Sequence, residues 1–148
     1  MNNIDVGLPE LLVILVFGAM AFAVALIPLI FFALTLQKAL DRCAPENRAM
    51  SPRMVWLLLI PFFNLIWNFI VVTRMAATLE SEFRMRQIPI EQNPGQGIGI
   101  AYAILFICTF VPLLGLLAGF ACLVCWIIYW VKIAECSGRL AASRALPA

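Results

Sequence analysis

Long runs of apolar residues, separated by short polar connections, dominate this chain. The first run, residues 11–36, contains no charged side chain and exceeds the ~20 residues that cross the hydrocarbon core of a bilayer. The second run, residues 54–73, is also long enough to span. The third is interrupted near its middle, which predicts a hairpin of two helices over residues 98–112 and 116–133. We therefore expect an all-α integral membrane protein with four apolar helical segments.

Two polar loops, residues 37–53 and 87–97, connect these segments. The first loop ends in Ser51 and Pro52, a good N-cap residue followed by a proline suited to the first helical position, so a helix is expected to begin there. Beyond residue 73 apolar side chains recur every four positions among charged ones. This pattern predicts that residues 74–86 extend the second helix along the membrane interface.

The centre of the second segment is unusually polar for a membrane span. It carries Pro61, Asn64 and Asn68, and the two asparagines fall on one helical face because they are four positions apart. Proline removes a backbone hydrogen bond, so the segment is expected either to span with a kink at Pro61 or to enter the membrane there and return. The asparagines are expected to tie this segment to neighbouring helices, or to line a small aqueous path.

Composition supports a membrane location for a single domain, residues 1–148. The chain is 64% hydrophobic and only 12% charged, whereas soluble domains carry roughly 25% charged residues. Lipid must therefore cover most of the apolar surface. A net charge of +2 does not favour nucleic-acid binding. Residues 1–10 contain no Lys or Arg, so the first apolar run is not expected to be a cleaved signal.

The distribution of Lys and Arg bears on topology. If every segment spans, the best arrangement places six of these ten residues on the inner side of the membrane, together with the amino terminus, and four on the outer side. If the second segment re-enters instead, all ten lie on the inner side, as the positive-inside rule favours. The re-entrant arrangement requires a non-helical bend at membrane depth, which is tolerated where protein or water surrounds it. We favour the re-entrant arrangement.

Several classes of chemistry are disfavoured. The chain has no histidine, and every Asp and Glu lies outside or at the edge of an apolar run, which argues against proton relays, haem and zinc. No cofactor or metal is expected. Cys122 and Cys125 form a C-x-x-C pair with Cys108 on the preceding segment, but without a nearby cation they are better explained as packing residues. The glycine-rich stretch 94–99 follows no strand, so phosphate binding is improbable.

Small residues spaced by four mark candidate helix contacts. Gly99 with Ala103, and Gly115 with Gly119, allow helix backbones to approach closely. A similar stripe lies on the first segment at Gly18, Ala21 and Ala25. Pairs of opposite charge, Glu80/Arg84, Glu82/Arg86 and Glu135/Arg139, are expected to support exposed helix ends.

Three stretches carry a resemblance to known sequences. They read PENRAMSP over residues 45–52, VWLLLIPFFN over 55–64 and CWIIYWVKIA over 125–134. With these motifs, the chain resembles, over residues 37–139, a group of uncharacterised small bacterial multi-helix membrane proteins. The resemblance implies a multi-pass protein of the bacterial inner membrane, and it carries over no functional residue.

These observations favour a non-enzymatic accessory or scaffold subunit, in contact with the lipid bilayer and packed as a homo-oligomer or within a larger membrane complex. The alternative is an oligomeric pathway for a small solute, ion or lipid, using the break between Pro61 and Asn64. A third hypothesis, an enzyme acting on lipid headgroups through Glu80, Glu82 or Arg84, is weaker, since no nucleophile or metal partner stands at a suitable spacing.

Overall fold

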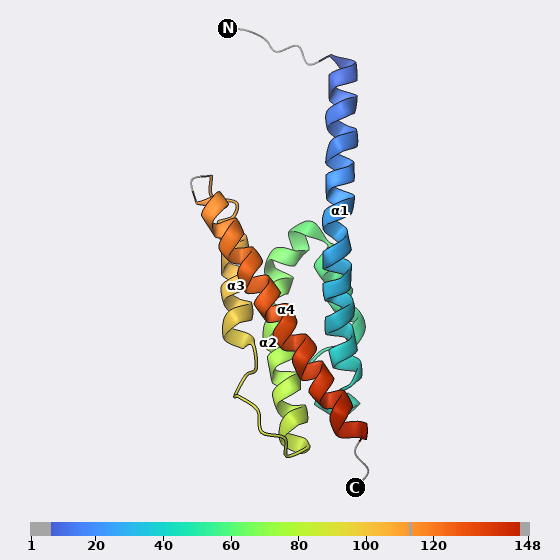
Figure 1. Ribbon diagram of the computed structural model, residues 1–148, viewed down its shortest axis with the longest axis vertical. Coiled ribbons are helices and arrows are strands. Elements are labelled where there is room, and N and C mark those ends of the chain that lie inside the picture. Colours follow the sequence, from blue (N-terminus) through green and yellow to red (C-terminus); the bar gives the residue numbers. More distant parts are fainter. Residues whose placement is uncertain (1–6, 113, 146–148) are drawn as a thin grey trace.

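Helices make up nearly all of the computed structural model, which describes residues 7–112 and 114–145 (Figure 1). In chain order the helices are α1 (Leu8–Asp41), the 3-10 helices η1 (Pro45–Asn47) and η2 (Pro52–Leu59), α2 (Pro61–Met85), α3 (Gln96–Cys108) and α4 (Gly115–Ala145). No strand occurs among these described residues. The prediction of an all-α protein is confirmed. Residues 1–6 lie outside the described residues, and with them most of the stretch 1–10 that was considered as the start of a cleaved signal.

Three of the helices, α1, α2 and α4, are long and apolar enough to span a membrane. Their most apolar windows have mean hydropathies of 2.8, 1.4 and 2.1. Helix α3 has only 13 residues and is the shorter arm of a hairpin with α4. The structure therefore supports a membrane protein with three helices of spanning length, where the sequence pattern predicted four apolar segments.

The second apolar segment is divided in two at Ile60. This residue has an extended backbone, φ −84° and ψ 110°, between the end of η2 and the start of α2. Proline disfavours a helical conformation in the residue before it and suits the first position of a helix, so Pro61 both ends η2 and begins α2. A helix does begin at Pro52, but it is the 3-10 helix η2, and the Ser51 side chain does not cap it.

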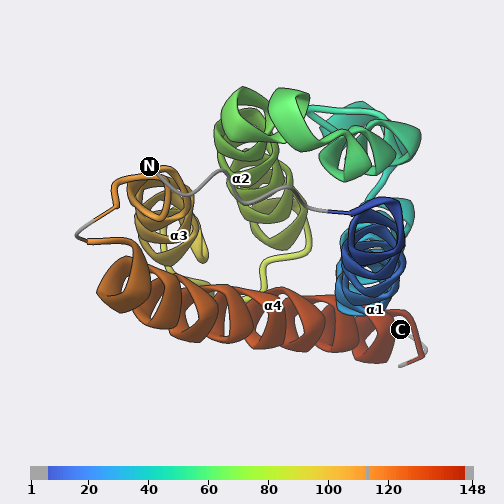
Figure 2. The same ribbon diagram turned by 90° about the horizontal axis from the view of Figure 1, so that it is seen from above.

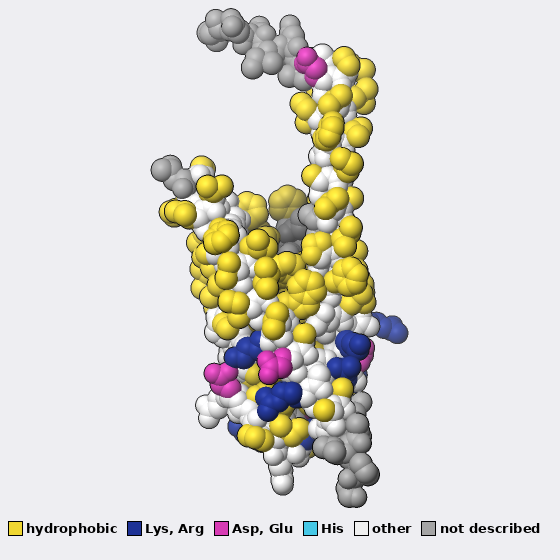
Figure 3. Space-filling view, in the orientation of Figure 1, with side chains coloured by type: hydrophobic (Ala, Val, Ile, Leu, Met, Phe, Trp, Pro, Cys, Tyr) yellow, Lys and Arg dark blue, Asp and Glu magenta, His cyan; other side chains and the backbone are white. Residues whose placement is uncertain are grey.

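The chain reverses direction at each of its connections (Figures 1 and 2). In the view of Figure 1, α1 runs downward, η2 upward, α2 downward, α3 upward and α4 downward. The polar connections before η2 and before α3, together with the carboxyl end of α4, therefore meet at the lower end. Figure 3 shows Lys and Arg gathered in the lower part of this face together with Asp and Glu, while hydrophobic side chains predominate above them.

The core lies toward this charged end. Helix α1 contributes Phe32, Leu36 and Leu40 to it, while the other helices add further apolar side chains, including Met75, Leu79, Phe83, Tyr129, Ile133 and Leu140. Residues 74–86 were predicted to lie along the membrane interface. That prediction was wrong for their apolar face, because Met75, Leu79 and Phe83 are fully buried inside the bundle. An apolar stripe spaced by four residues suits a neighbouring helix as well as a lipid surface.

The upper part of α1 stands apart from the other helices. Every described side chain from Leu8 to Val24 is exposed, and packing against the bundle becomes continuous only near Phe32. The helix continues without a break through Pro28. At its start, the Gly7 amide donates to the Glu10 carboxylate at 3.2 Å, which satisfies one amide that lies outside the helical ladder.

Candidate functional site

The polar centre of α2 lies inside the bundle. Asn64 and Asn68 are 7% and 1% exposed, respectively, on the same face of the helix. The Asn68 side chain lies near Tyr102 of α3. The third residue singled out in this segment, Pro61, supplies the backbone break that places Asn64 in the first turn of α2.

Four buried polar atoms in the described structure have no hydrogen-bond partner. They are Asn64 Oδ1 and Asn68 Nδ2 on α2, and Trp126 Nε1 and Tyr129 OH on α4. Leaving a buried donor or acceptor unpaired costs about 1–3 kcal/mol. The set includes an acceptor, two donors and a hydroxyl that can act as both, so water or a small neutral molecule can satisfy it.

Gly99 lets α3 approach the other helices closely. A Cβ atom at this position would lie 2.5 Å from Val72 Cγ1 and 2.9 Å from the Tyr129 ring. Tyr129 is thereby held between α3 and α1, where its ring also packs edge-on against Phe32 at a centroid distance of 6.1 Å. One turn along α3 from Gly99, Ala103 is buried as well.

The second small-residue pair lies at the start of α4. A Cβ atom on Gly115 would stand 2.8 Å from the Thr109 carbonyl oxygen, so the turn before α4 leaves no room for a side chain there. A Cβ atom on Gly119 would lie 3.9 Å from the Thr109 methyl group, which is ordinary contact. On α1, by contrast, nothing within 4 Å faces Gly18, and Ala21 is exposed. The side chain of Ala25, the third member of that stripe, is outside the described structure.

Glu82 is the most completely enclosed charge that the structure describes. Its side chain has no exposed surface, and its carboxylate accepts four hydrogen bonds. Oε2 accepts from the Ala44 amide at 2.8 Å and from Asn47 Nδ2 at 2.9 Å. Oε1 accepts from both Nε, at 2.8 Å, and Nη2 of Arg86. Every lone pair that desolvation would penalise is thus paired, as a buried carboxylate requires.

Arginines extend this network to the ends of the other helices. Arg86 donates to the Leu140 carbonyl and the Ser143 hydroxyl on α4, and to the Arg42 carbonyl at the end of α1. Arg42 in turn donates to the carbonyl and hydroxyl of Ser137, at 2.6 and 2.7 Å. We call this group, Arg42, Ala44, Asn47, Glu82 and Arg86 with their partners on α4, the polar clamp. It joins α1, α2 and α4 at the charged end.

The predicted pairs of opposite charge on α2 differ from each other in burial. Glu80 and Arg84 do form an exposed ion pair, at 3.0 Å. Glu82 and Arg86 also pair, but the prediction that they support an exposed helix end was wrong, because the carboxylate is buried. Arg139 donates to the Pro89 carbonyl and lies 5.6 Å from the centre of the Phe83 ring.

A signal for the burial of Glu82 was present in the sequence. Glu82 follows Met75 by seven positions and Leu79 by three, which places it on the apolar stripe of that helix. The partners that stabilise it could not be found this way, because Ala44 contributes only its backbone amide and Asn47 lies in a loop.

The loop before α3 is anchored to α4 by an exposed ion pair. Lys132 Nζ lies 2.6 Å from Glu91 Oε2, and this hydrogen bond with a positive charge lowers the pKa of the Glu91 carboxyl below its ordinary value. The loop then enters α3 through Gly95, whose positive φ of 77° suits glycine and whose Cα faces the Tyr129 ring. The glycine-rich stretch 94–99 is thus a helix entry packed against an aromatic ring.

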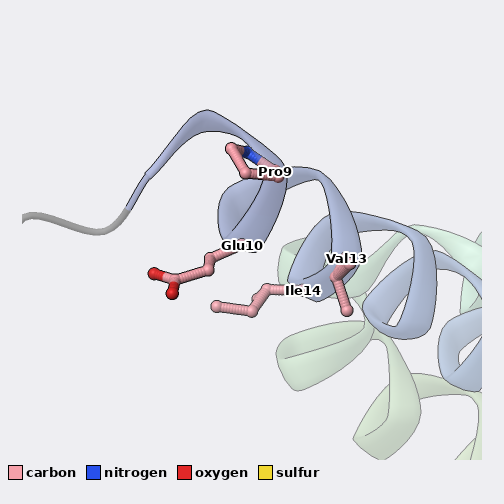
Figure 4. A pocket seen from close by; sticks show the side chains of 4 residues that line it. All are labelled: Pro9, Glu10, Val13 and Ile14. Carbon is pink, nitrogen blue, oxygen red and sulfur yellow. The ribbon is translucent and has the colours of Figure 1, made fainter.

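Three hollows are relevant to ligand binding. The largest, about 490 Å³, is lined by Pro9, Glu10, Val13 and Ile14, all from the first turns of α1 (Figure 4), so only one wall is present. A second, about 290 Å³, lies between α3 and α4 and includes Tyr102, Cys122 and Trp126 in its lining. A third, about 350 Å³, lies between α1 and α4 at the charged end.

The cysteines offer no metal-binding group within the described part of the chain, where no cluster of three or more metal-ligating side chains occurs. All five are free thiols. Cys122 makes only a long contact, 3.8 Å, to the Tyr102 carbonyl, and it lies against the second hollow.

Taken together, the fold and these groups define an all-helical protein with three helices able to span a membrane and with the Lys and Arg side chains of the face in Figure 3 gathered at one end. No family model matches the chain, and neither the curated proteins nor the solved structures include a match. The resemblance to small bacterial membrane proteins stays a prediction.

Proposed function

We propose that this chain is a non-enzymatic membrane subunit whose first helix packs against a second copy of the chain or against the helices of a larger complex. The observation that carries the proposal is the isolation of upper α1, since side chains from Leu8 to Val24 make no part of the core. Helices in lipid associate through close packing of small residues, and Gly18 and Ala21 offer such a stripe on this free segment.

The lengths of the helices support this role. The hydrogen bond from Trp130 Nε1 to Thr35 Oγ1, 2.9 Å, places these residues of α4 and α1 at one level. From that level α1 rises about 40 Å to Leu8, whereas α4 rises about 22 Å to Gly115, at 1.5 Å per residue. The upper α1 therefore extends about 18 Å farther and has no helix of its own chain to pack against.

Enlarging the small-residue stripe tests this proposal. We expect Gly18→Leu and Ala21→Leu to weaken self-association or partner capture about tenfold, because the added side chains separate the helices. Helical folding should persist, since no atom of the bundle lies within 4 Å of a Cβ at Gly18 and Ala21 is exposed. Size-exclusion chromatography with light scattering, in mild detergent and after crosslinking in the membrane, measures the effect.

The matched control is Ala23→Leu, the same enlargement on the opposite side of α1. It should leave assembly unchanged. A wild-type chain that is a lone monomer, with no partner recovered by crosslinking, contradicts the proposal.

We further propose that η2 and the upper part of α2 form a re-entrant hairpin, with all Lys and Arg on the inner side of a bacterial inner membrane. The positive-inside rule and the gathering of cationic side chains at one end support this arrangement. Contacts of η2 with α1 and α2 support it as well, because Val55 and Leu58 bury η2 against the bundle while the break at Ile60 stays exposed. Trp56 Nε1 donates to Gln37 Oε1 at 2.7 Å, and Trp67 Nε1 donates to the Met54 carbonyl at 3.0 Å.

A second candidate function, passage of a small neutral solute through an oligomer, is favoured by the unpartnered polar atoms. Asn64 Oδ1 lies just beyond the break at Pro61, and Asn68 Nδ2 lies one turn farther along α2. Groups that are buried, polar and unpaired at membrane depth are characteristic of sites that accept water or a polar ligand.

Replacing both asparagines by leucine separates the two candidate functions. A pathway role predicts intact assembly and loss of solute flux into liposomes. A packing role predicts that assembly or stability changes, with no flux to lose. Thr73→Val is the control on the same helix, because the Thr73 hydroxyl is already bonded to the carbonyl oxygens of Phe69 and Ile70.

A further inference from the structure

The hollow between α1 and α4 at the charged end combines an apolar wall with cationic side chains. Helix α1 supplies Phe31, Leu34, Thr35, Lys38 and Arg42, and α4 supplies Ala134 and Ser137. The α1 residues recur every three or four positions, so they form a single stripe facing α4. The hollow encloses about 350 Å³, enough for a phosphate group with its ester substituents.

Its two cationic side chains, Lys38 and Arg42, lie about one helical turn apart. Arg42 is held in place by Ser137, which is 4% exposed and accepts from Arg42 Nη1 through both its hydroxyl and its carbonyl oxygen. Those two bonds hold the guanidinium beside the hollow. Lys38 is exposed, and within the described residues it takes part in none of the ion pairs, which involve Glu80, Glu82 and Glu91.

The apolar and polar parts of the hollow are ordered along α1. Phe31 and Leu34, 58% and 44% exposed, precede Lys38 on the side toward the apolar body of the protein. The Trp130 indole donates to Thr35 Oγ1 at the level between them. Indole groups are enriched in the headgroup layer of a bilayer, so we expect Lys38 and Arg42 at the level of the lipid phosphates and Phe31 and Leu34 where acyl chains begin.

We propose that this hollow binds one anionic phospholipid, with its phosphate between Lys38 and Arg42 and an acyl chain along Phe31 and Leu34. Charge complementarity selects the headgroup, and the apolar wall selects a lipid over a free phosphate ion. The site requires that the chain is inserted in a membrane, but it requires neither assembly through α1 nor a solute pathway. Its failure would therefore leave both candidate functions standing.

Native mass spectrometry of the full chain, with phosphatidylglycerol or phosphatidylcholine added at defined concentrations, tests the proposal. We expect tighter binding of phosphatidylglycerol than of phosphatidylcholine, and about a fivefold loss of that affinity in Lys38→Gln. Lys38→Arg should retain the affinity. Ala134→Glu, which adds a carboxylate at an exposed position on the opposite wall, should lower it without altering either cation.

The matched control is Lys132→Gln, which removes an equal charge from the same end of the molecule but outside the hollow. It should bind phosphatidylglycerol within about twofold of the wild type. The proposal is overturned if the wild type shows no preference for phosphatidylglycerol, or if Lys38→Gln and Ala134→Glu bind as the wild type does. It is also overturned if Lys132→Gln loses as much affinity as Lys38→Gln, or if millimolar inorganic phosphate displaces the lipid.

Discussion

Replacing Glu82 with alanine should lower the free energy of unfolding by about 3–5 kcal/mol, the cost of removing one partner from a buried ion pair. Three donors would lose their acceptor at once: the Arg86 guanidinium, the Ala44 amide and the Asn47 amide group. Because Arg86 also bonds the end of α1 and the last turns of α4, the loss should loosen all three helices at the charged end.

The effect can be measured as unfolding of the purified chain in mild detergent, followed by tryptophan fluorescence during titration with a denaturing detergent. Glu80→Ala is the matched control. Glu80 also pairs with an arginine four residues later on α2 and accepts a hydrogen bond from the Asn93 amide, but both interactions are exposed, and exposed pairs contribute about 0–1 kcal/mol. Equal destabilisation by the two substitutions would mean that the polar clamp does not hold the bundle together.

The membrane class and the helical fold could be predicted from the sequence because both depend on composition and on the length of apolar runs. Residues 98–112 and 116–133 were predicted as a hairpin, and the structure has α3 and α4 there. The number of spanning helices was harder to predict. Helix α3 ends at Cys108, and hydropathy alone does not distinguish a short arm packed on a neighbour from a full span.

The interior of the bundle was less predictable, because it depends on contacts between residues far apart in the chain. The face shared by Asn64 and Asn68 follows from their spacing, but the position of Asn68 near Tyr102 depends on how α2 and α3 pack. The same holds for Gly99, which was singled out as a small residue but whose neighbours, Val72 and Tyr129, come from two other helices. Spacing identifies a face, and only tertiary packing identifies what that face meets.

The accessibility of the two polar loops from one side of the membrane is the most direct test of the fold. A conventional span through residues 54–73 would put the loop before η2 and the loop before α3 on opposite sides. In the structure both loops lie at the charged end and are tied to the same helix, since Ala49 bonds Arg74 and Thr78 while Asn93 bonds Glu80. We therefore expect the two loops to be accessible from one side only.

Single cysteines at Ala49 and Gln92, both exposed, report on these two loops, and one at Val111 reports on the turn between α3 and α4. They are placed in a chain whose five native cysteines are replaced by alanine and are labelled with a membrane-impermeant maleimide in intact and in opened bacterial cells. Positions 49 and 92 should react only after the cells are opened, and position 111 should react from outside. Labelling of positions 49 and 92 from opposite sides would contradict both the re-entrant hairpin and the placement of the two loops together at the charged end.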